Sequence, residues 1–421
     1  MSFQKPVFVS LSPNTEKDDI SLAFKVLFKF HKEENKKTEE LERELKDYLN
    51  VKNLLSFNSG RSALMGILYS FNIQKDDEVL IQAFTCNAAI NPIIERGARP
   101  IFVDIDNTLN IDPIDLERKI TSNTKAVIIQ HTFGWPAQIK KIVEICKRNQ
   151  LVLIEDTAHS LGAEYEGKLC GTFGDASFFS FGRDKIISSV FGGAAMIKDE
   201  SIFEKMKIFQ KNISLPPKIW TLQQILHPIL TNYIVLPSYK LNQYFGRIVI
   251  GFFHKISLLS KAVYKKEKMA LIPSVFPKKM PSPLSLLALN QIKKIERFNE
   301  HRRKISEIYY KNIDKKLFIP VFPEKGLEKK PVFMRYPVLV SSGTDDILKK
   351  MRNHNIYLND GWRKSPIVPL DTDLEKVHYV LGSCPRAEKI ANRIINLPTH
   401  INVSENKAIK IVKLLNECIK N

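Results

Sequence analysis

Short apolar segments alternate with amphipathic helical segments through the first half of this chain, and this alternation restricts the fold more than any other feature. The apolar segments that we interpret as strands are residues 53–60, 78–85, 100–106, 125–133, 151–157, 176–182 and 192–197. Between most of them stand stretches such as "RSALMGILYSFNI" and "AQIKKIVEICKRN", whose apolar residues recur at helical spacing. This alternation predicts an α/β fold, in which helices cover both faces of a mainly parallel sheet. The order of the strands is not readable.

Beyond about residue 205 the alternation stops, and the 421 residues exceed the usual reach of one core. We predict an N-terminal extension (1–37), a large α/β domain (38–211), a helical insert (212–275) and a smaller C-terminal α+β domain (276–421). In the last of these, "FMRYPVLV" is interpreted as a strand, and "LSLLALNQIKKIERFNEHRRKISEIYYKNI" as one long helix.

The insert mixes aromatic, aliphatic and basic residues, as in "NYIVLPSYKLNQYFGRIVIGFFHK". We expect most of this apolar surface to be buried by packing within the protein. Because basic residues stand among the aromatic ones, docking on a membrane surface or on a partner protein is the alternative.

The net charge of +19 raises the question of nucleic-acid binding. The lysines are spread along the chain, often beside acidic residues, and no zinc-finger or RRM signature occurs, so we expect no nucleic-acid partner. The five cysteines are scattered and form no C-x-x-C pair, which argues against a disulfide framework or a metal site. No signal peptide or membrane-spanning run is evident, and we expect a cytoplasmic protein.

Three stretches could carry chemistry, and each follows a predicted strand. The first is "NSGRSAL", residues 58–64. Gly60 permits a tight turn, and the amides of Arg61 and Ser62 would open a helix whose N-terminus can bind a phosphate. The alternative is an ordinary strand–helix turn that binds nothing.

The second stretch is "LVLIEDTAHSLGA", in which Asp156 ends a strongly apolar strand. A buried carboxylate needs a cation or strong hydrogen-bond donors, and the protonated ring nitrogen of a cofactor would meet that need. A helix cap, a core arginine or a magnesium ion would meet it as well.

The third stretch is "FFSFGRDKIISSVFGGAAM", where Ser180 ends a strand and Lys185 follows. The hydroxyl of Ser180 could join a phosphate site. A lysine whose pKa is lowered by its surroundings reacts with carbonyl groups, whereas a solvated loop lysine does not. Taken together, the three stretches supply the anion site, carboxylate and lysine that pyridoxal phosphate requires.

At this point the sequence resembles the DegT–DnrJ–StrS family of sugar aminotransferases, which are fold-type I pyridoxal-phosphate enzymes. The resemblance covers roughly residues 38–205 and 280–415. It rests on "SFNSGRSAL", "GARPIFVDID", "LIEDTAHSLGAEYEGKLCGTFGDASFFSFGRDK" and "RAEKIANRIINLPTH".

The resemblance implies a role for each matching residue. Lys185 would bind the cofactor covalently and later transfer a proton, and Asp156 would hold the pyridinium nitrogen. His159 would donate a hydrogen bond to the ring oxygen of the cofactor. The phosphate would be bound by Gly60, Arg61 and Ser180, with Arg61 in place of the usual Thr.

The sequence also departs from the family pattern. Cys86 stands where an aromatic ring usually stacks on the cofactor, so that neighbouring Phe84 could supply the stacking instead. Phe191 replaces the acidic residue before Gly192 and Gly193. The G-x-N segment, which sends an Asn from the partner subunit to the phosphate, is replaced by "FPKKMPSPLSLLALNQI".

The resemblance implies a homodimeric aminotransferase that moves an amino group from an amino acid, with glutamate as the expected donor, onto a nucleotide-linked keto-sugar for surface glycan or amino-sugar biosynthesis. A sugar dehydratase of the same family would have His in place of Lys185. A regulator or scaffold that binds the cofactor without turnover, and an enzyme of the family acting on a non-nucleotide substrate, are the remaining alternatives.

Overall fold

The computed structural model describes residues 6–11, 13–28, 36–322 and 328–420. At its centre lies a seven-stranded sheet that is parallel except for β11, which runs antiparallel to both of its neighbours. The strands, in their order across the sheet, are β2 (Leu54–Phe57), β11 (Gly193–Ile197), β10 (Ala176–Ser180), β7 (Val152–Asp156), β6 (Thr124–Gln130), β3 (Glu78–Gln82) and β5 (Arg99–Val103). The mainly parallel sheet that the alternation predicts is therefore confirmed.

Helices cover both faces of this sheet because both faces are apolar. Along β3, Val79 and Ile81 belong to one apolar core, whereas Leu80 between them belongs to another on the opposite face. Successive side chains of a strand point to opposite faces, so each core needs its own helical layer. The helices of this region are α2 (Lys36–Leu49), α3 (Gly60–Ser70), α4 (Asn87–Glu95), α5 (Pro113–Arg118), α6 (Ile139–Arg148) and α7 (Glu200–Asn212).

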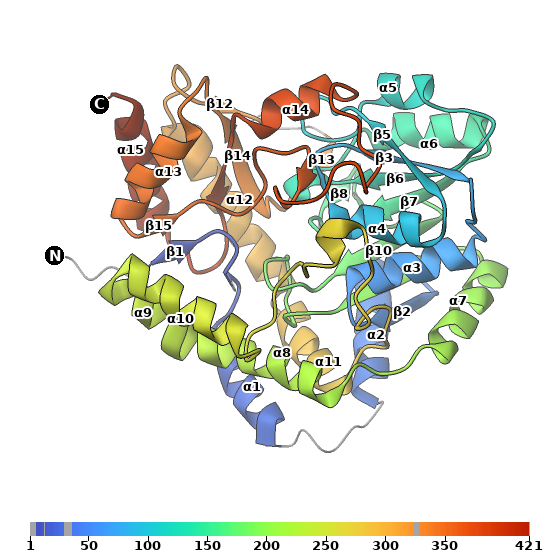
Figure 1. The fold of residues 1–421 in the computed structure, drawn as a ribbon, viewed down its shortest axis with the longest axis horizontal. Helices are drawn as coiled ribbons and strands as arrows, with labels where there is room; N and C mark the ends of the chain where they lie inside the picture. Colours follow the sequence, from blue (N-terminus) through green and yellow to red (C-terminus); the bar gives the residue numbers. More distant parts are fainter. Residues whose placement is uncertain (1–5, 12, 29–35, 323–327, 421) are drawn as a thin grey trace.

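A separate core forms around a small antiparallel sheet on the left of Figure 1. Its elements are β12 (Ile319–Pro320), β14 (Arg335–Leu339), β17 (Ile394–Pro398), α12 (Ile295–Asn312), α13 (Thr344–Asn353) and α15 (Glu405–Lys420). The N-terminal strand β1 (Val7–Phe8) also joins this side of the molecule, because it pairs in parallel with β15 (Ile356–Tyr357).

The helix expected after Pro281 is two helices, α11 (Ser282–Ile292) and α12, separated by a turn at Lys293 and Lys294. The two helices bury their apolar residues in different cores. Leu284 and Leu287 pack in the core of the large sheet, whereas Ile305 and Tyr309 pack in the small core.

The predicted insert is helical where the structure describes regular elements. It contains α8 (Lys218–Leu230), a π-helical turn (Thr231–Val235), α9 (Leu236–Leu241), α10 (Gln243–Lys255) and a short 3-10 turn (Glu267–Met269). Helix α8 packs against α1 (Lys17–Phe28) and α11, and these helices form the lower edge of the molecule in Figure 1. Among the described residues, none of the helices combines the length and apolarity needed to cross a bilayer. The proposed division into domains stays a prediction.

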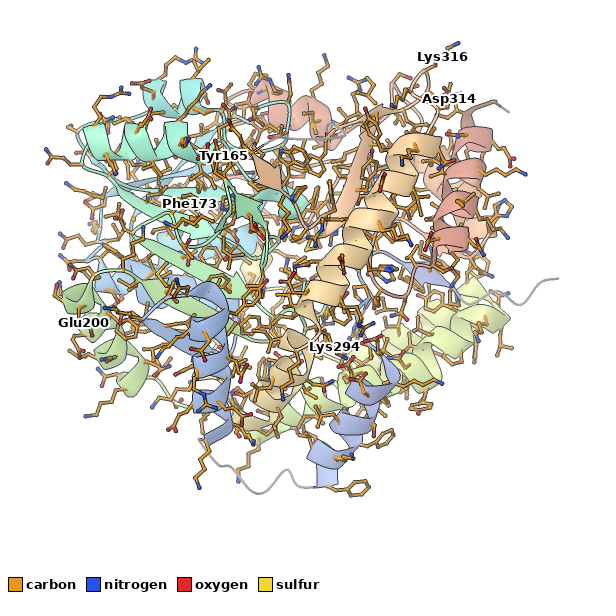
Figure 2. The ribbon with its side chains drawn as sticks, turned by 180° about the vertical axis from the view of Figure 1, so that it is seen from behind. Tyr165, Phe173, Glu200, Lys294, Asp314 and Lys316 are labelled. Atoms are coloured by element: carbon orange, nitrogen blue, oxygen red, sulfur yellow. The ribbon has the colours of Figure 1, made fainter. Side chains whose placement is uncertain are left out.

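The first helix is held to the body of the protein by charge. Lys294, at the start of α12 and labelled in Figure 2, contacts the carboxylates of Asp18 and Asp19 at 2.8 and 2.9 Å. Arg297 pairs with Glu16 beside them. These three acidic side chains lie close enough to share a metal ion, but here each of them pairs with Lys294 or Arg297.

The remaining short elements complete the chain between these layers. They are β4 (Thr85–Cys86), which pairs with β16 (Ile367–Val368), the strands β8 (Glu164–Tyr165), β9 (Lys168–Leu169) and β13 (Lys329–Lys330), the 3-10 turn Thr132–Gly134, and α14 (Pro385–Ala391).

Candidate active site

A cavity of about 200 Å³ lies where β7 and β10 end and α3 begins. This is the carboxyl edge of the parallel strands, the usual position of binding sites in open α/β sheets. The predicted site residues that line it are Gly60, Arg61, Cys86, Asp156, His159, Ser180 and Lys185. The other sides of the cavity come from the insert, through Ala262 and Val263, and from the C-terminal region, through Asp360 and Trp362.

Lys185 lies in a turn after β10, and buried polar contacts hold this turn. The side-chain amide of Asn14 donates to the carbonyl oxygens of Lys185 and Ile186, the latter at 3.0 Å. The buried guanidinium of Arg302 donates to Asn14 at 2.7 Å. The Lys185 ammonium is 3.9 Å from the Asp184 carboxylate. The lysine therefore projects into the cavity from a backbone that is fixed on the far side.

Asp156 ends β7 and is only 5 % exposed. Its Oδ1 accepts a hydrogen bond from the Ala158 amide at 2.9 Å, and its Oδ2 has no hydrogen-bond donor among the described residues. Burial raises the pKa of this carboxyl to about 6. A buried carboxylate on a cavity wall with one unused oxygen is suited to a cationic or hydrogen-bond-donating ligand.

His159 is buried beside the cavity, where its ring stacks on Phe133 at a centroid distance of 5.6 Å. Burial, together with the positive charges of Lys185 and Arg335, holds the pKa of His159 well below its usual value. The Phe133 amide donates to Nδ1 at 3.4 Å. The proton of the neutral ring consequently lies on Nε2, which can donate a hydrogen bond.

The start of α3 is packed tightly against the end of β10. The Ser59 hydroxyl caps the helix by accepting from the Ser62 amide at 3.1 Å. A Cβ atom at Gly193 would lie 2.5 Å from the Gly60 nitrogen and 2.6 Å from the Phe179 oxygen. The second glycine of the Gly-Gly pair thus allows β11 to lie beside the helix start without blocking it.

Arg61 is held by the insert. Its Nε lies 3.1 Å from Oε1 of Glu267, which is 1 % exposed, and an Nη donates to the Ala262 carbonyl at 3.1 Å. Its other Nη is buried and has no hydrogen-bond partner among the residues that the structure describes. Arg183 lies nearby, where it donates to the carbonyl and hydroxyl of Ser260, and burial lowers its pKa to about 10.

Phe191 replaces the acidic residue that the family pattern places before the Gly-Gly pair. Its ring is near two arginines, with the Arg61 and Arg183 guanidinium carbons 5.9 and 5.6 Å from its centroid. The carboxylate that neutralises Arg61 therefore comes from Glu267 of the insert.

Cys86 lines the cavity, and burial raises the pKa of its thiol. Phe84 does not line the cavity. Its ring packs edge-on against Phe133 and Trp362, at centroid distances of 6.1 and 5.6 Å. Stacking of Phe84 on the cofactor stays a prediction, and Trp362 is the aromatic residue that this cluster presents at the cavity.

Two charged residues of the site were missed by the sequence analysis. Arg335 is 1 % exposed and pairs with both Asp184 and Asp360, at 2.7 and 2.8 Å. The sequence feature that could have revealed Arg335 is the presence of an arginine inside the predicted apolar strand "FMRYPVLV". The feature that could have revealed Glu267 is that it is the first acidic residue after a long stretch without aspartate or glutamate.

Comparison with known proteins settles which family shares this arrangement. The model of the DegT/DnrJ/EryC1/StrS aminotransferase family matches residues 14–222 and 254–416. The chain belongs to this family. The match begins at residue 14, whereas the resemblance noted in the sequence begins at residue 38, and the match leaves out residues 223–253. The family, the fold and the aminotransferase class predicted from the sequence are confirmed.

Two individual relatives match 90 % and 49 % of the chain. GDP-perosamine synthase of Escherichia coli O157:H7 is 27 % identical over 386 residues, which are 90 % of this chain and 89 % of that one. A Helicobacter pylori UDP-4-amino-4,6-dideoxy-N-acetyl-beta-L-altrosamine transaminase is 33 % identical over 207 residues, 49 % of this chain and 55 % of its own. The solved PMP-form of Spr1654 from Streptococcus pneumoniae shares the fold, with a TM-score of 0.77, 20 % identity, and coverage of 99 % of this chain and 98 % of that chain.

Pyridoxal phosphate is the cofactor of this aminotransferase, as predicted, and the cavity has the groups that it needs. Asp156 offers an unused carboxylate oxygen, Lys185 offers an amine, and the Gly60 amide opens a helix. The buried Nη of Arg61, which has no partner within the described part of the chain, adds a donor for an anion. The residues therefore fit the cofactor.

Proposed function

We propose that this enzyme transfers an amino group from an amino acid, in the first instance glutamate, to a nucleotide-linked keto-sugar. The observation that carries the proposal is the meeting of Lys185 and Asp156 at one cavity, at positions that match the family motif. The product would enter surface glycan or amino-sugar biosynthesis. The relatives named for GDP- and UDP-linked amino sugars support this substrate class.

The residues of the cavity would hold the cofactor at both ends. Gly60, Ser180 and Arg61 would bind its phosphate, and Asp156 would keep a proton on its ring nitrogen. His159 would donate from Nε2 to the ring oxygen. Bound in this way, pyridoxal phosphate supplies an electron sink for the bonds to the substrate carbon.

Lys185 would perform two tasks in this arrangement. Its amine would hold the cofactor, and as a free amine it would carry a proton to and from the substrate carbon. The fixed turn around Lys185 supports the second task, because proton transfer requires a short and constant distance.

The enzyme is proposed to act in the cytoplasm as a homodimer. All five cysteines are free, which suits a reducing compartment. The dimer rests on the family resemblance.

The test is the visible absorbance spectrum of the protein with pyridoxal phosphate, beside Lys185→Ala. We expect the band of lysine-bound cofactor in the wild type only, and its loss when glutamate is added, with formation of 2-oxoglutarate. Mass spectrometry would then detect the amino sugar made from GDP- or UDP-linked 4-keto sugars. A band that no amino acid bleaches would exclude the transferase and favour a regulator.

A further inference from the structure

The chain has no aspartate or glutamate between Glu204 and Glu267, although acidic residues number 45 in total. Basic residues recur through this stretch: Lys205, Lys207, Lys211, Lys218, Lys240, Arg247, Lys255, Lys261, Lys265 and Lys266. A long surface segment without acids has a positive potential that its own side chains do not neutralise. Much of it, residues 223–253, also lies outside the match to the family model.

One face of α10 presents large apolar side chains to solvent. Tyr244, Ile248 and Phe252 follow one another at intervals of four residues, and so they lie on one side of the helix. They are 65 %, 67 % and 54 % exposed. The exposed residues Phe245 of α10, Ile256 directly after α10 and Leu241 of α9 continue this surface, and we call the six residues the apolar stripe. Contiguous apolar surfaces of this kind mark interaction sites.

The opposite face of the α9–α10 pair is firmly attached to the protein. Tyr239 of α9 packs edge-on against Phe8 and Tyr357, at centroid distances of 4.9 and 5.2 Å. Gly246 of α10 lies directly against the Tyr239 ring, because a Cβ atom there would overlap it. The pair is therefore a fixed element whose buried face joins the body and whose apolar stripe faces outward.

Basic side chains accompany the apolar stripe. Lys240 precedes Leu241, and Arg247 and Lys255 stand beside Ile248 and Ile256; all three basic residues are exposed. In a symmetric contact between two copies of this chain, such a surface would face its own like charges. An anionic partner relieves this repulsion.

We propose that α9 and α10 dock this enzyme on the surface of a bilayer that contains anionic phospholipids. A helix with an apolar face and a basic flank lies in the plane of the membrane interface, with its aromatic and aliphatic side chains among the lipid headgroups and upper acyl chains. Lysine and arginine at the same depth attract anionic headgroups. The proposal is independent of the sugar substrate, and it gives the acid-free stretch and the apolar stripe one common role.

The experiment is co-sedimentation of the full chain, loaded with pyridoxal phosphate, with two kinds of vesicle: mixed phosphatidylglycerol and phosphatidylcholine, and phosphatidylcholine alone. We expect strong binding to the anionic vesicles only, weakened by salt. The double variant Ile248→Glu with Phe252→Glu is expected to lose at least about tenfold in binding. We expect vesicle binding to weaken about fivefold for each positive charge removed when Lys240, Arg247 and Lys255 are replaced by Gln.

The matched control is Val380→Glu with Leu381→Glu, which charges two residues that are each 69 % exposed outside the insert. This control should bind vesicles as the wild type does, and all variants should keep the cofactor absorbance band if they fold. Equal vesicle binding by the α10 variant and the wild type would overturn the proposal. No binding by the wild type, with a dimer that dissociates in the α10 variant, would overturn it too and assign the stripe to a second copy.

Discussion

Asp156 is suited to binding the cofactor, but its burial lowers the stability of the cofactor-free protein. In the cofactor-free protein, burial raises the pKa of this carboxyl to about 6, against an ordinary value of 3.8. Below about pH 4 the carboxyl is protonated in both the folded and the unfolded chain, and it has no effect on stability. As the pH rises from about 4 to about 6, the carboxyl loses its proton in the unfolded chain but keeps it in the folded chain. The free energy of unfolding therefore falls by about 3 kcal/mol over this range, and above about pH 6 this contribution stays constant.

We therefore predict that Asp156→Asn makes the cofactor-free protein more stable than the wild type at pH 7, and equally stable near pH 4. Urea unfolding at a series of pH values measures the difference. The same variant should bind pyridoxal phosphate more weakly, because the ring nitrogen loses its carboxylate. Parallel stability curves for the two proteins across this pH range would contradict the prediction.

Glu267 is the buried counter-charge of Arg61, and the ion pair joins the insert to the start of α3. Glu267→Gln is predicted to lower the free energy of unfolding by about 3 kcal/mol, because it leaves a buried guanidinium without a carboxylate. It should also weaken cofactor binding, measured by titration of the absorbance band.

The control for this variant is Glu204→Gln. Glu204 forms an exposed pair with Lys207, and its loss should change the free energy of unfolding by less than about 1 kcal/mol. Equal effects of the two substitutions would mean that the Arg61–Glu267 pair contributes nothing beyond surface charge.

At the scale of elements, α10 offers a matched pair of glycines. A Cβ atom at Gly246 would overlap the Tyr239 ring, whereas a Cβ atom at Gly251 would meet nothing within 4 Å. Alanine is favoured over glycine in a helix by about 1 kcal/mol. Gly251→Ala is therefore predicted to stabilise the protein slightly, and Gly246→Ala to destabilise it, by about 1–3 kcal/mol, through forced overlap.

Thermal unfolding of both variants measures this pair of opposite effects. Two stabilising substitutions would show that α9 and α10 do not pack through Tyr239. The comparison is informative because both glycines lie on the same helix, so that helix propensity acts equally on them.

At the scale of the whole molecule, Arg335 connects the two cores at the cavity. It comes from the small antiparallel sheet and reaches Asp184, the neighbour of Lys185, as well as Asp360. Burial alone would raise the pKa of Asp184, but the positive charges of Lys185 and Arg335 bring it below its usual value. Arg335 thus stabilises the ionised form of a carboxylate next to the reactive lysine.

Arg335→Ala is predicted to lower the free energy of unfolding by about 3–5 kcal/mol, because it leaves the buried carboxylate of Asp360 without its cation and removes one of the two cations beside Asp184. The release of cofactor, followed by absorbance, should begin at a lower urea concentration than in the wild type. Lys304→Ala, which removes an exposed pair with Glu405 in the same region, is the control and should change stability by less than about 1 kcal/mol.

The sequence by itself determined the sheet-and-helix architecture, the family and the residues of the motif. Strand and helix periods are local properties, so the alternation up to residue 205 was sufficient to predict the layers. The sequence predicted that Gly60, Asp156, Ser180 and Lys185 lie together, because each stands at or after the end of a strand and parallel strands end at one common edge. All four line the cavity, and their roles toward the cofactor stay a prediction.

Only the tertiary structure decided the order of the strands, the contacts of Glu267 and Arg335, and the exposure of α10. The Arg61–Glu267 pair joins residues far apart in the chain, and no local pattern encodes such a pairing. The apolar period of α10 likewise predicts an amphipathic helix but not what covers its apolar face. That depends on packing against Phe8 and Tyr357, which places Tyr239 inside and leaves Ile248 and Phe252 outside.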